Sequence, residues 1–196
     1  MQKIFGLSGY AGCGKDTFFD IARLILSKKG LTCQRFALAD ELKRDIRPFI
    51  LDKTNIDILS CTRVDKEIIR PLMVDYGEIK RILSNGRQWV DLVDRQVKES
   101  KADVLFITDI RHDVYAKDEY YWLKNECGGN LIYIERFCIE DGYKVYLKAP
   151  NKEELANNGS LEKKCDLKVS WEYKKGEDLF QSLSATVGFA LNKFEL

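Results

Sequence analysis

The chain has 196 residues, of which 45% are hydrophobic and 32% are charged. This length and balance are typical of a globular protein with a sizeable core, so we expect one domain over residues 1–196. The formal net charge is only +1, which gives no general attraction to nucleic acid or to a membrane surface. No stretch approaches the roughly 18 apolar residues of a membrane span. We therefore expect a cytoplasmic protein without a membrane or nucleic-acid partner.

Cysteine and histidine usage argues against a zinc site and against a disulfide scaffold. The six cysteines form no C-x-x-C pair, and the chain has a single histidine. Zinc sites need several such ligands at short spacing, and a chain of this length does not depend on disulfides for a core. Reduced thiols in a reducing compartment are the simpler interpretation.

Strand patterns and helix patterns alternate along the chain. In chain order they are strand 3–8, helix 16–29, strand 32–37, helices 40–51, 65–83 and 88–97, strand 103–108, helix 118–126, and strands 131–135 and 167–171. Gly176 opens a C-terminal helix with apolar residues at Leu183, Val187 and Leu191. Strands that alternate with helices predict an α/β fold, with a parallel sheet and helices on both of its faces.

The segment 138–165 interrupts this alternation. It is polar, lacks a firm period, and contains the turn signals Ala-Pro-Asn at 149–151 and Asn-Asn-Gly at 157–159. Long connections of this kind inside compact domains usually form lids or binding loops. We expect a lid inserted over approximately residues 138–165.

A glycine-rich motif lies between the first expected strand and the first expected helix. Glycines permit backbone angles closed to other residues, and successive N–H groups of such a loop form a concave site for phosphate oxygens. The following helix adds the positive end of its dipole, and the Lys15 ammonium reaches the β- and γ-phosphates. The motif in this context predicts a P-loop NTPase-type domain that binds ATP. The residues expected to hold the nucleotide are Gly9, Tyr10, Ala11, Gly12, Cys13, Gly14, Lys15, Asp16 and Thr17.

The residue after Lys15 departs from the common form of this motif. Asp16 stands where Ser or Thr normally gives an oxygen to Mg²⁺, and Thr17 follows one residue later. Asp16 either holds the metal through water or contacts the acceptor substrate. We expect both Asp16 and Thr17 near Mg²⁺.

The end of the apolar run 103–108 gives the second candidate group. Asp109 follows this run directly, and a carboxylate at the carboxyl end of a buried strand is where a metal-side aspartate belongs in a P-loop fold. The alternative is an aspartate that caps the loop. Arg111 should lie at the same rim, where its guanidinium suits bidentate contact with phosphate. His112 is interpreted as a loop residue, because phosphoryl transfer depends chiefly on positioning and charge stabilisation.

Other basic and aromatic side chains are weaker candidates, because solvation is the default role for each of the 32 Lys and Arg residues. Arg136 directly follows strand 131–135 and should share the rim with the phosphates. Arg70 lies early in an expected helix, and Lys43 lies on the helix after the second strand. Trp89 is a candidate for stacking on a base, although aromatic residues at helical spacing belong more often to a core.

The phosphate loop, SGYAGCGKDT, resembles that of the deoxynucleoside monophosphate kinases of bacteriophages, which also ends in GKDT. Further stretches are similar to family motifs: 69–77 to R-x-L-M-x-x-x-G, 86–90 to the stretch after it, 108–111 to D-x-R, and 166–169 to the late strand. Gly128-Gly129 and the strand that ends in Arg136 also fit. Animal-type phosphomevalonate kinase has a similar layout, including GKD and D-x-R. The resemblance points to a kinase clan more firmly than to one acceptor.

The resemblance implies that ATP and Mg²⁺ bind on the loop, and that Lys15, Asp16, Arg111 and Arg136 act in catalysis. It also implies a small-molecule acceptor, a homodimer, and an origin in a virus-infected cell. Lids of this clan often carry His-x-[Ser/Thr]-Glu, whereas 151–154 here reads Asn-Lys-Glu-Glu and lacks the His. The residues expected at the acceptor are Lys43, Arg70, Trp89, Asp109, Arg111 and Glu154.

Our first hypothesis is ATP- and Mg²⁺-dependent phosphorylation of a deoxynucleoside monophosphate to the diphosphate. Three alternatives stay open: another small-molecule kinase with a phosphomevalonate-like acceptor, a kinase for a modified base within DNA, and a non-catalytic nucleotide-binding protein. Near-zero net charge argues against a long DNA footprint. The absence of an N-K-x-D motif argues against a GTP switch.

Overall fold

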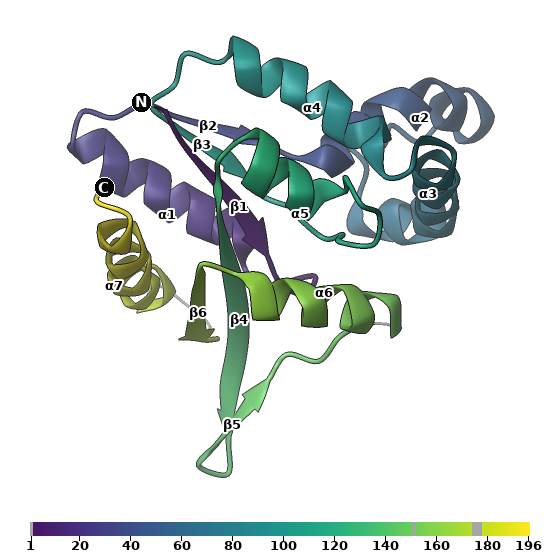
Figure 1. Cartoon of the computed structure of the whole chain (residues 1–196). Coiled ribbons are helices and arrows are strands. Elements are labelled where there is room, and N and C mark those ends of the chain that lie inside the picture. Colours follow the sequence, from purple (N-terminus) through teal and green to yellow (C-terminus); the bar gives the residue numbers. More distant parts are fainter. Residues whose placement is uncertain (1, 151, 174–177) are drawn as a thin grey trace.

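The computed structural model describes residues 2–150, 152–173 and 178–196 (Figure 1). Gly176, expected to open the last helix, and Asn151, in the expected lid, lie outside these described residues. A six-stranded sheet forms the centre of the molecule. Its strands are β1 (Lys3–Ser8), β2 (Cys33–Phe36), β3 (Val104–Ile107), β4 (Asn130–Glu140), β5 (Tyr143–Tyr146) and β6 (Leu167–Glu172).

Parallel pairing places the ends of the central strands at one edge of the sheet. β1 lies between β3 and β4, with Phe5 opposite Phe106 and Leu7 opposite Ile132. β2 extends the sheet beyond β3, and β6 pairs with β4 in parallel, while only β5 is antiparallel among these pairings. The phosphate loop after β1, the Asp109 segment after β3 and the distal half of β4 therefore meet at the carboxyl edge.

Helices cover both faces of the sheet, as Figure 1 shows. One core cluster joins β1, β3, β4 and β6 to helices α1 (Lys15–Lys28) and α7 (Asp178–Lys193). A second cluster joins the other face to α4 (Arg87–Glu99), to the short turn α5 (Glu119–Tyr121) with its continuation Trp122–Glu126, and to α6 (Lys152–Lys164). The expected α/β fold with helices on both faces is confirmed. Within the described residues, no helix has both the length and the apolar character needed to cross a membrane.

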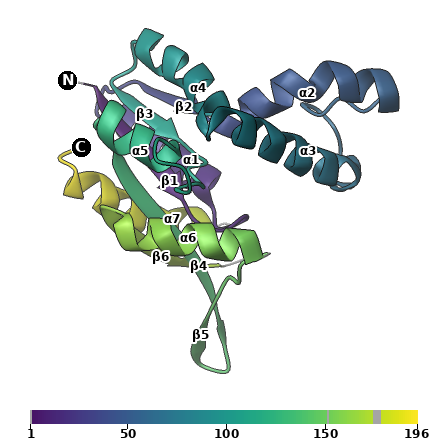
Figure 2. The ribbon, with the colours of Figure 1, turned by 45° about the vertical axis from the view of Figure 1, so that its right-hand side comes forward.

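Helices α2 (Leu38–Thr54) and α3 (Arg63–Ser84) form an arm that projects from the sheet (Figure 2). The α2–α3 arm has a small core of its own, built from Ile46, Ile50, Ile58 and Ile69. A capping box between Thr62 and Asp65 fixes the start of α3, because each side chain accepts a hydrogen bond from the other residue's N–H. Asn85 ends that helix in the left-handed conformation.

The segment 138–165 differs from the irregular lid that the sequence predicts. β4 continues to Glu140, turns at Asp141 and Gly142, both with positive φ, and returns as β5. Helix α6 follows and packs against β1 and β4. The helix escaped prediction because it is mostly polar: Leu161 is its fully buried apolar residue, so it shows no clear apolar stripe.

Candidate functional site

The phosphate loop is fixed by close contacts with its neighbouring strands. Gly9 has φ of +130°, and a Cβ there would lie 2.2 Å from the Ile134 carbonyl oxygen of β4. Gly14 has φ of +102°, and a Cβ there would lie 2.5 Å from the Trp171 ring of β6. The Trp171 indole N–H also donates to the Cys13 carbonyl at 2.9 Å. Glycine is needed at both positions, and β4 and β6 together hold the loop in shape.

Lys15 lies within this loop and is only 8% exposed. Its ammonium donates to the carbonyl oxygens of Gly9 at 2.6 Å and Tyr10 at 3.1 Å. Burial lowers the pKa of Lys15, and the nearby Arg111 guanidinium lowers it further. Phosphate oxygens are stronger acceptors than these carbonyls, so the amine lies where a bound phosphate can recruit it.

The loop and Arg111 meet at a single carboxylate. Glu154, near the start of α6, accepts from the Ala11 backbone N–H at 3.1 Å through one oxygen. Its other oxygen accepts from the Arg111 guanidinium at 3.4 Å. The expectation that Arg111 shares the rim with the phosphate loop therefore agrees with the geometry. The Glu154 carboxylate marks a position where one anionic group contacts donors from the loop after β1 and from the segment after β3.

Asp109 caps a helix in this structure. Its two oxygens accept from the backbone N–H groups of Leu38 at 2.9 Å and Ala39 at 2.8 Å, at the start of α2. Burial raises the pKa of this carboxyl, while the two N–H bonds act in the opposite direction. These contacts match the capping alternative, although the capped element is α2 and not the loop that follows β3. A role for Asp109 at Mg²⁺ or at the acceptor remains a prediction.

A row of alternating charges extends from the loop toward the α2–α3 arm. Asp16 pairs with Arg35 at 3.2 Å, Arg35 pairs with Asp40 at 2.8 Å, and Asp40 pairs with Lys43 at 2.7 Å. Lys43 is thus linked to the loop through Asp40 and Arg35, two residues that the sequence analysis missed. A role for Lys43 at the acceptor remains a prediction. Arg35 lies within an expected strand. A single arginine in a strand does not indicate a site until strand pairing shows which face of the sheet its side chain occupies.

A buried ion network holds the backbone of Arg111 in place. Arg81 of α3 forms a bidentate pair with Asp118, at 2.9 and 3.1 Å, and contacts Glu119 at 3.2 Å. Glu119 in turn accepts from the backbone N–H groups of Arg111 at 2.7 Å and His112 at 3.0 Å. Burial raises the pKa of Glu119 to about 8. The network fixes the backbone from which the Arg111 side chain reaches the phosphate loop.

His112 is held neutral beside this network. Burial lowers its pKa to about 3, and the neighbouring Arg81 acts in the same direction. Its Nδ1 lies 3.2 Å from the Asn157 amide nitrogen of α6. The structure therefore agrees with a loop residue whose imidazole stays uncharged near neutral pH.

Two expected substrate contacts are not brought to the loop. The Arg70 guanidinium pairs with Glu67, one turn earlier in α3, at 2.8 Å, and half of its side chain is exposed. Trp89 is 3% exposed and packs in the core on the α4 face. The expectation that Trp89 stacks on a base is corrected, because core side chains cover its ring.

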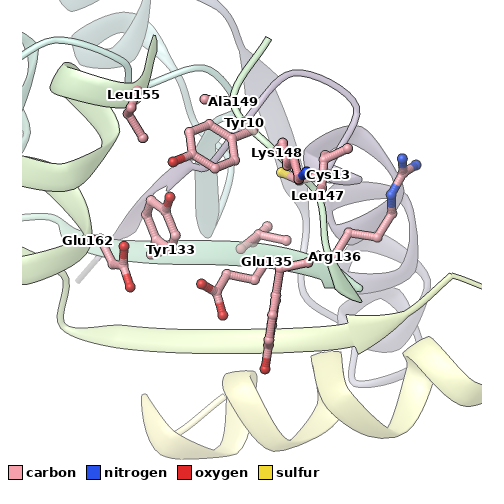
Figure 3. A pocket seen from close by; sticks show the side chains of 12 residues that line it. Tyr10, Cys13, Tyr133, Glu135, Arg136, Leu147, Lys148, Ala149, Leu155 and Glu162 are labelled. Carbon is pink, nitrogen blue, oxygen red and sulfur yellow. The ribbon is translucent and has the colours of Figure 1, made fainter. Parts of the chain in front are cut away.

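Arg136, by contrast, lies beside the loop, with its guanidinium 4.6 Å from the centre of the Tyr173 ring. It also lines a cavity of about 550 Å³ between the loop, β4, the β5–α6 connection and α6 (Figure 3). No local sequence pattern indicates this cavity, because its walls come from four separate segments. The residues that line the cavity are Tyr10, Cys13, Tyr133, Ile134, Glu135, Arg136, Tyr146, Leu147, Lys148, Ala149, Leu155 and Glu162.

The residues at the loop fit Mg²⁺ held mainly by a nucleotide. In the part of the chain that the structure describes, no group of three or more His, Cys, Asp and Glu side chains gathers as a metal site. Mg²⁺ in phosphate-transfer sites usually takes one or two carboxylates, with phosphate oxygens and water as its other ligands. The side chain of Asp16 is 75% exposed and directly follows Lys15, so its carboxylate is accessible for this role.

Comparisons with known proteins add little to this picture. No protein-family model matches the chain, and no curated protein matches it. Among solved structures, the chain is similar to shikimate kinase from Acinetobacter baumannii in complex with shikimate, at 15% sequence identity and a TM-score of 0.49. The match covers 98% of this chain and 95% of that chain. A likeness at this level does not identify an activity.

Proposed function

We propose that the protein transfers the γ-phosphoryl group of ATP to a deoxynucleoside monophosphate, with Mg²⁺ as cofactor. The observation that carries this proposal is the convergence of the Ala11 N–H and the Arg111 guanidinium on one carboxylate of Glu154. A phosphoryl oxygen is also a negatively charged hydrogen-bond acceptor, so it can take the place of that carboxylate. Donors from the phosphate loop and from the β3 side then surround a single transferring group.

The chain's own residues supply charge and orientation in this reaction. The loop N–H groups and Lys15 hold the β- and γ-phosphates, while Arg111 contacts the transferring phosphoryl group from the opposite side. An acceptor phosphate oxygen attacks the γ-phosphorus, the bond to the β–γ bridging oxygen breaks, and ADP leaves with that electron pair. Asp16 and Thr17 would hold Mg²⁺, which when bound would neutralise charge on the phosphates. Arg136 lies at the same rim and covers the nucleotide side of the site.

The first experiment measures ADP release from ATP and Mg²⁺ with each deoxynucleoside monophosphate, and with phosphomevalonate in parallel. Stimulation by at least one deoxynucleotide, and not by phosphomevalonate, supports the proposal. Stimulation by phosphomevalonate alone favours the alternative of a small-molecule kinase with a phosphomevalonate-like acceptor. ATP binding without any acceptor-dependent turnover favours a non-catalytic nucleotide-binding protein.

The variant Lys15→Ala tests the role of the loop. We expect turnover to fall at least about 100-fold, because a preorganised charge at the transferring phosphate is lost. The thermal unfolding midpoint should not fall, since the removed ammonium is desolvated in the folded chain. Lys28→Ala, at the exposed end of the same helix, is the matched control and should retain turnover. Near-normal turnover of Lys15→Ala would refute the proposed mechanism.

A further inference from the structure

The charge of Glu154 acts on three groups that hold phosphate in the proposed reaction. Its carboxylate accepts from the Ala11 N–H at 3.1 Å and from the Arg111 guanidinium at 3.4 Å. Burial lowers the pKa of Lys15, and the nearby charge of Glu154 acts in the opposite direction. The protein therefore places a negative charge of its own where the γ-phosphate of ATP binds in that reaction. A carboxylate and a phosphoryl group cannot both occupy this position, because their like charges repel and they compete for the same donors.

Helix α6, which carries Glu154, is anchored through its C-terminal half. Leu161 is fully buried in the core on that face of the sheet. Ser160 and Lys164 both donate to the Asp113 carboxylate, at 2.7 and 2.5 Å. These contacts fix this half of the helix to the sheet and to the segment after β3, independently of the phosphate loop.

The first turns of α6 lie beside unfilled space. Leu155 is 56% exposed and lines the 550 Å³ cavity (Figure 3). Residues 146–149, which lead from β5 toward the helix, line the same cavity. Segments with few buried apolar contacts open at a low cost in free energy. The bonds from Glu154 to Ala11 and Arg111 should therefore decide where this end of the helix lies.

We propose that Glu154 is a γ-phosphate sensor, which occupies the γ-phosphate position until ATP displaces it together with the first turns of α6. This inference rests on the proposed function, since it takes the γ-phosphate to bind at Ala11 and Arg111. ATP wins the competition because its phosphates also bind Lys15 and the other N–H groups of the loop. ADP lacks the γ-phosphate and leaves the Glu154 contacts in place. Glu154 thus distinguishes the triphosphate from the diphosphate.

Nucleotide binding tests this exchange without any turnover. Calorimetry of the full chain with Mg²⁺ gives Kd for ADP and for a non-hydrolysable ATP analogue. In Glu154→Ala, Kd for the analogue should fall about tenfold, because charge-assisted hydrogen bonds no longer have to be broken. Kd for ADP should change by less than about twofold. A Kd for the analogue that does not fall, or an equal fall for both nucleotides, would overturn the inference.

Two further variants serve as controls for the loss of charge. Glu154→Gln keeps the shape and one acceptor oxygen, so Kd for the analogue should fall by a smaller factor of about threefold. Glu162→Gln makes the same change in the anchored half of α6, where the carboxylate pairs with Lys168 at 2.5 Å. It should leave both Kd values unchanged. A fall as large in Glu162→Gln as in Glu154→Gln would trace the effect to net charge and contradict the sensor role.

Hydrogen exchange measures whether the helix itself moves. Once displaced, the first turns of α6 lose their contact with the loop and fray. The amides of residues 156–158 should then exchange at least about fivefold faster with the saturating analogue than with ADP, while those of 162–164 stay protected in both. Equal exchange at 156–158 with the two nucleotides would overturn the displacement of α6.

The sensor and the proposed kinase reaction fail separately. If no acceptor stimulates ADP release, but Glu154→Ala selectively tightens binding of the analogue, the kinase reaction fails and the sensor stands. If an acceptor does stimulate ADP release, but Glu154→Ala binds the analogue no more tightly than the wild type, the sensor fails and the kinase reaction stands.

Discussion

The two sides of the candidate site are held in place by different physics. On the β1 side, the phosphate loop is fixed by steric contact, since Gly9 and Gly14 leave no room for a Cβ against Ile134 and Trp171. On the β3 side, the backbone of Arg111 is fixed by buried charge, through Glu119 and Arg81. Packing fails when volume is added, whereas an ion network fails when one partner is removed. Each side should therefore be sensitive to a different kind of substitution.

The contacts that hold the two sides also differ in whether they contain titratable groups. The steric contacts of the loop involve backbone carbonyl and indole groups, which do not titrate in the physiological range. The β3 side contains Glu119 and His112, whose pKa values are shifted by burial to about 8 and about 3. The pH dependence that Glu119 imposes should therefore act on the position of Arg111.

The largest expected effect is the loss of stability in Arg81→Met. The substitution leaves Asp118 and Glu119 buried without their cation, and breaking one partner of a buried pair costs about 3–5 kcal/mol of unfolding free energy. Urea unfolding monitored by tryptophan fluorescence measures it. Arg47→Met removes a solvent-exposed bidentate pair with Asp57, which water screens, and should cost far less. Similar losses in both variants would show that the buried network does not hold the β3 side.

A smaller effect is expected for added volume on the β1 side. In Gly9→Ala the new Cβ meets a backbone carbonyl oxygen, which cannot move without shifting β4, so we expect a loss of about 2–3 kcal/mol. Gly12→Ala is the matched control, because Gly12 also has positive φ but a Cβ there meets nothing within 4 Å. That variant should lose only about 1 kcal/mol. ATP affinity, measured by calorimetry, should fall in Gly9→Ala far more than in Gly12→Ala.

The same contrast explains what the sequence could predict. The phosphate loop was predictable because its glycines and Lys15 lie within seven consecutive residues between a strand and a helix. The layered α/β fold followed from apolar periodicity in the same local way. Arg81 and Asp118 are 37 residues apart and belong to separate elements, so no local pattern joins them. The cavity near Tyr10 was not predictable for the same reason, since four segments must be placed before it exists.

The smallest expected effect, per pH unit, is the change in unfolding free energy that titration of Glu119 causes. Its pKa is raised from 4.5 in the unfolded chain to about 8 in the folded one, so the folded state binds more protons between these values. Stability from this group is therefore present below pH 4.5 and is lost as pH rises toward 8, by at most about 1.4 kcal/mol per pH unit. A variant without the Glu119 carboxyl isolates its contribution over pH 6.5 to 8, because unfolded His112, half protonated at pH 6.5, contributes equally to both proteins.

Glu119→Gln provides the comparison for that measurement. The amide cannot titrate, so urea unfolding of this variant should show a flatter pH dependence than the wild type between pH 6.5 and 8. A parallel readout is the amide exchange rate of Arg111 and His112, whose N–H groups bond to the Glu119 side chain. If wild type and variant lose stability equally over this window, Glu119 is ionised throughout. The β3 side would then be a fully charged network at neutral pH, and its contrast with the sterically held loop would become sharper.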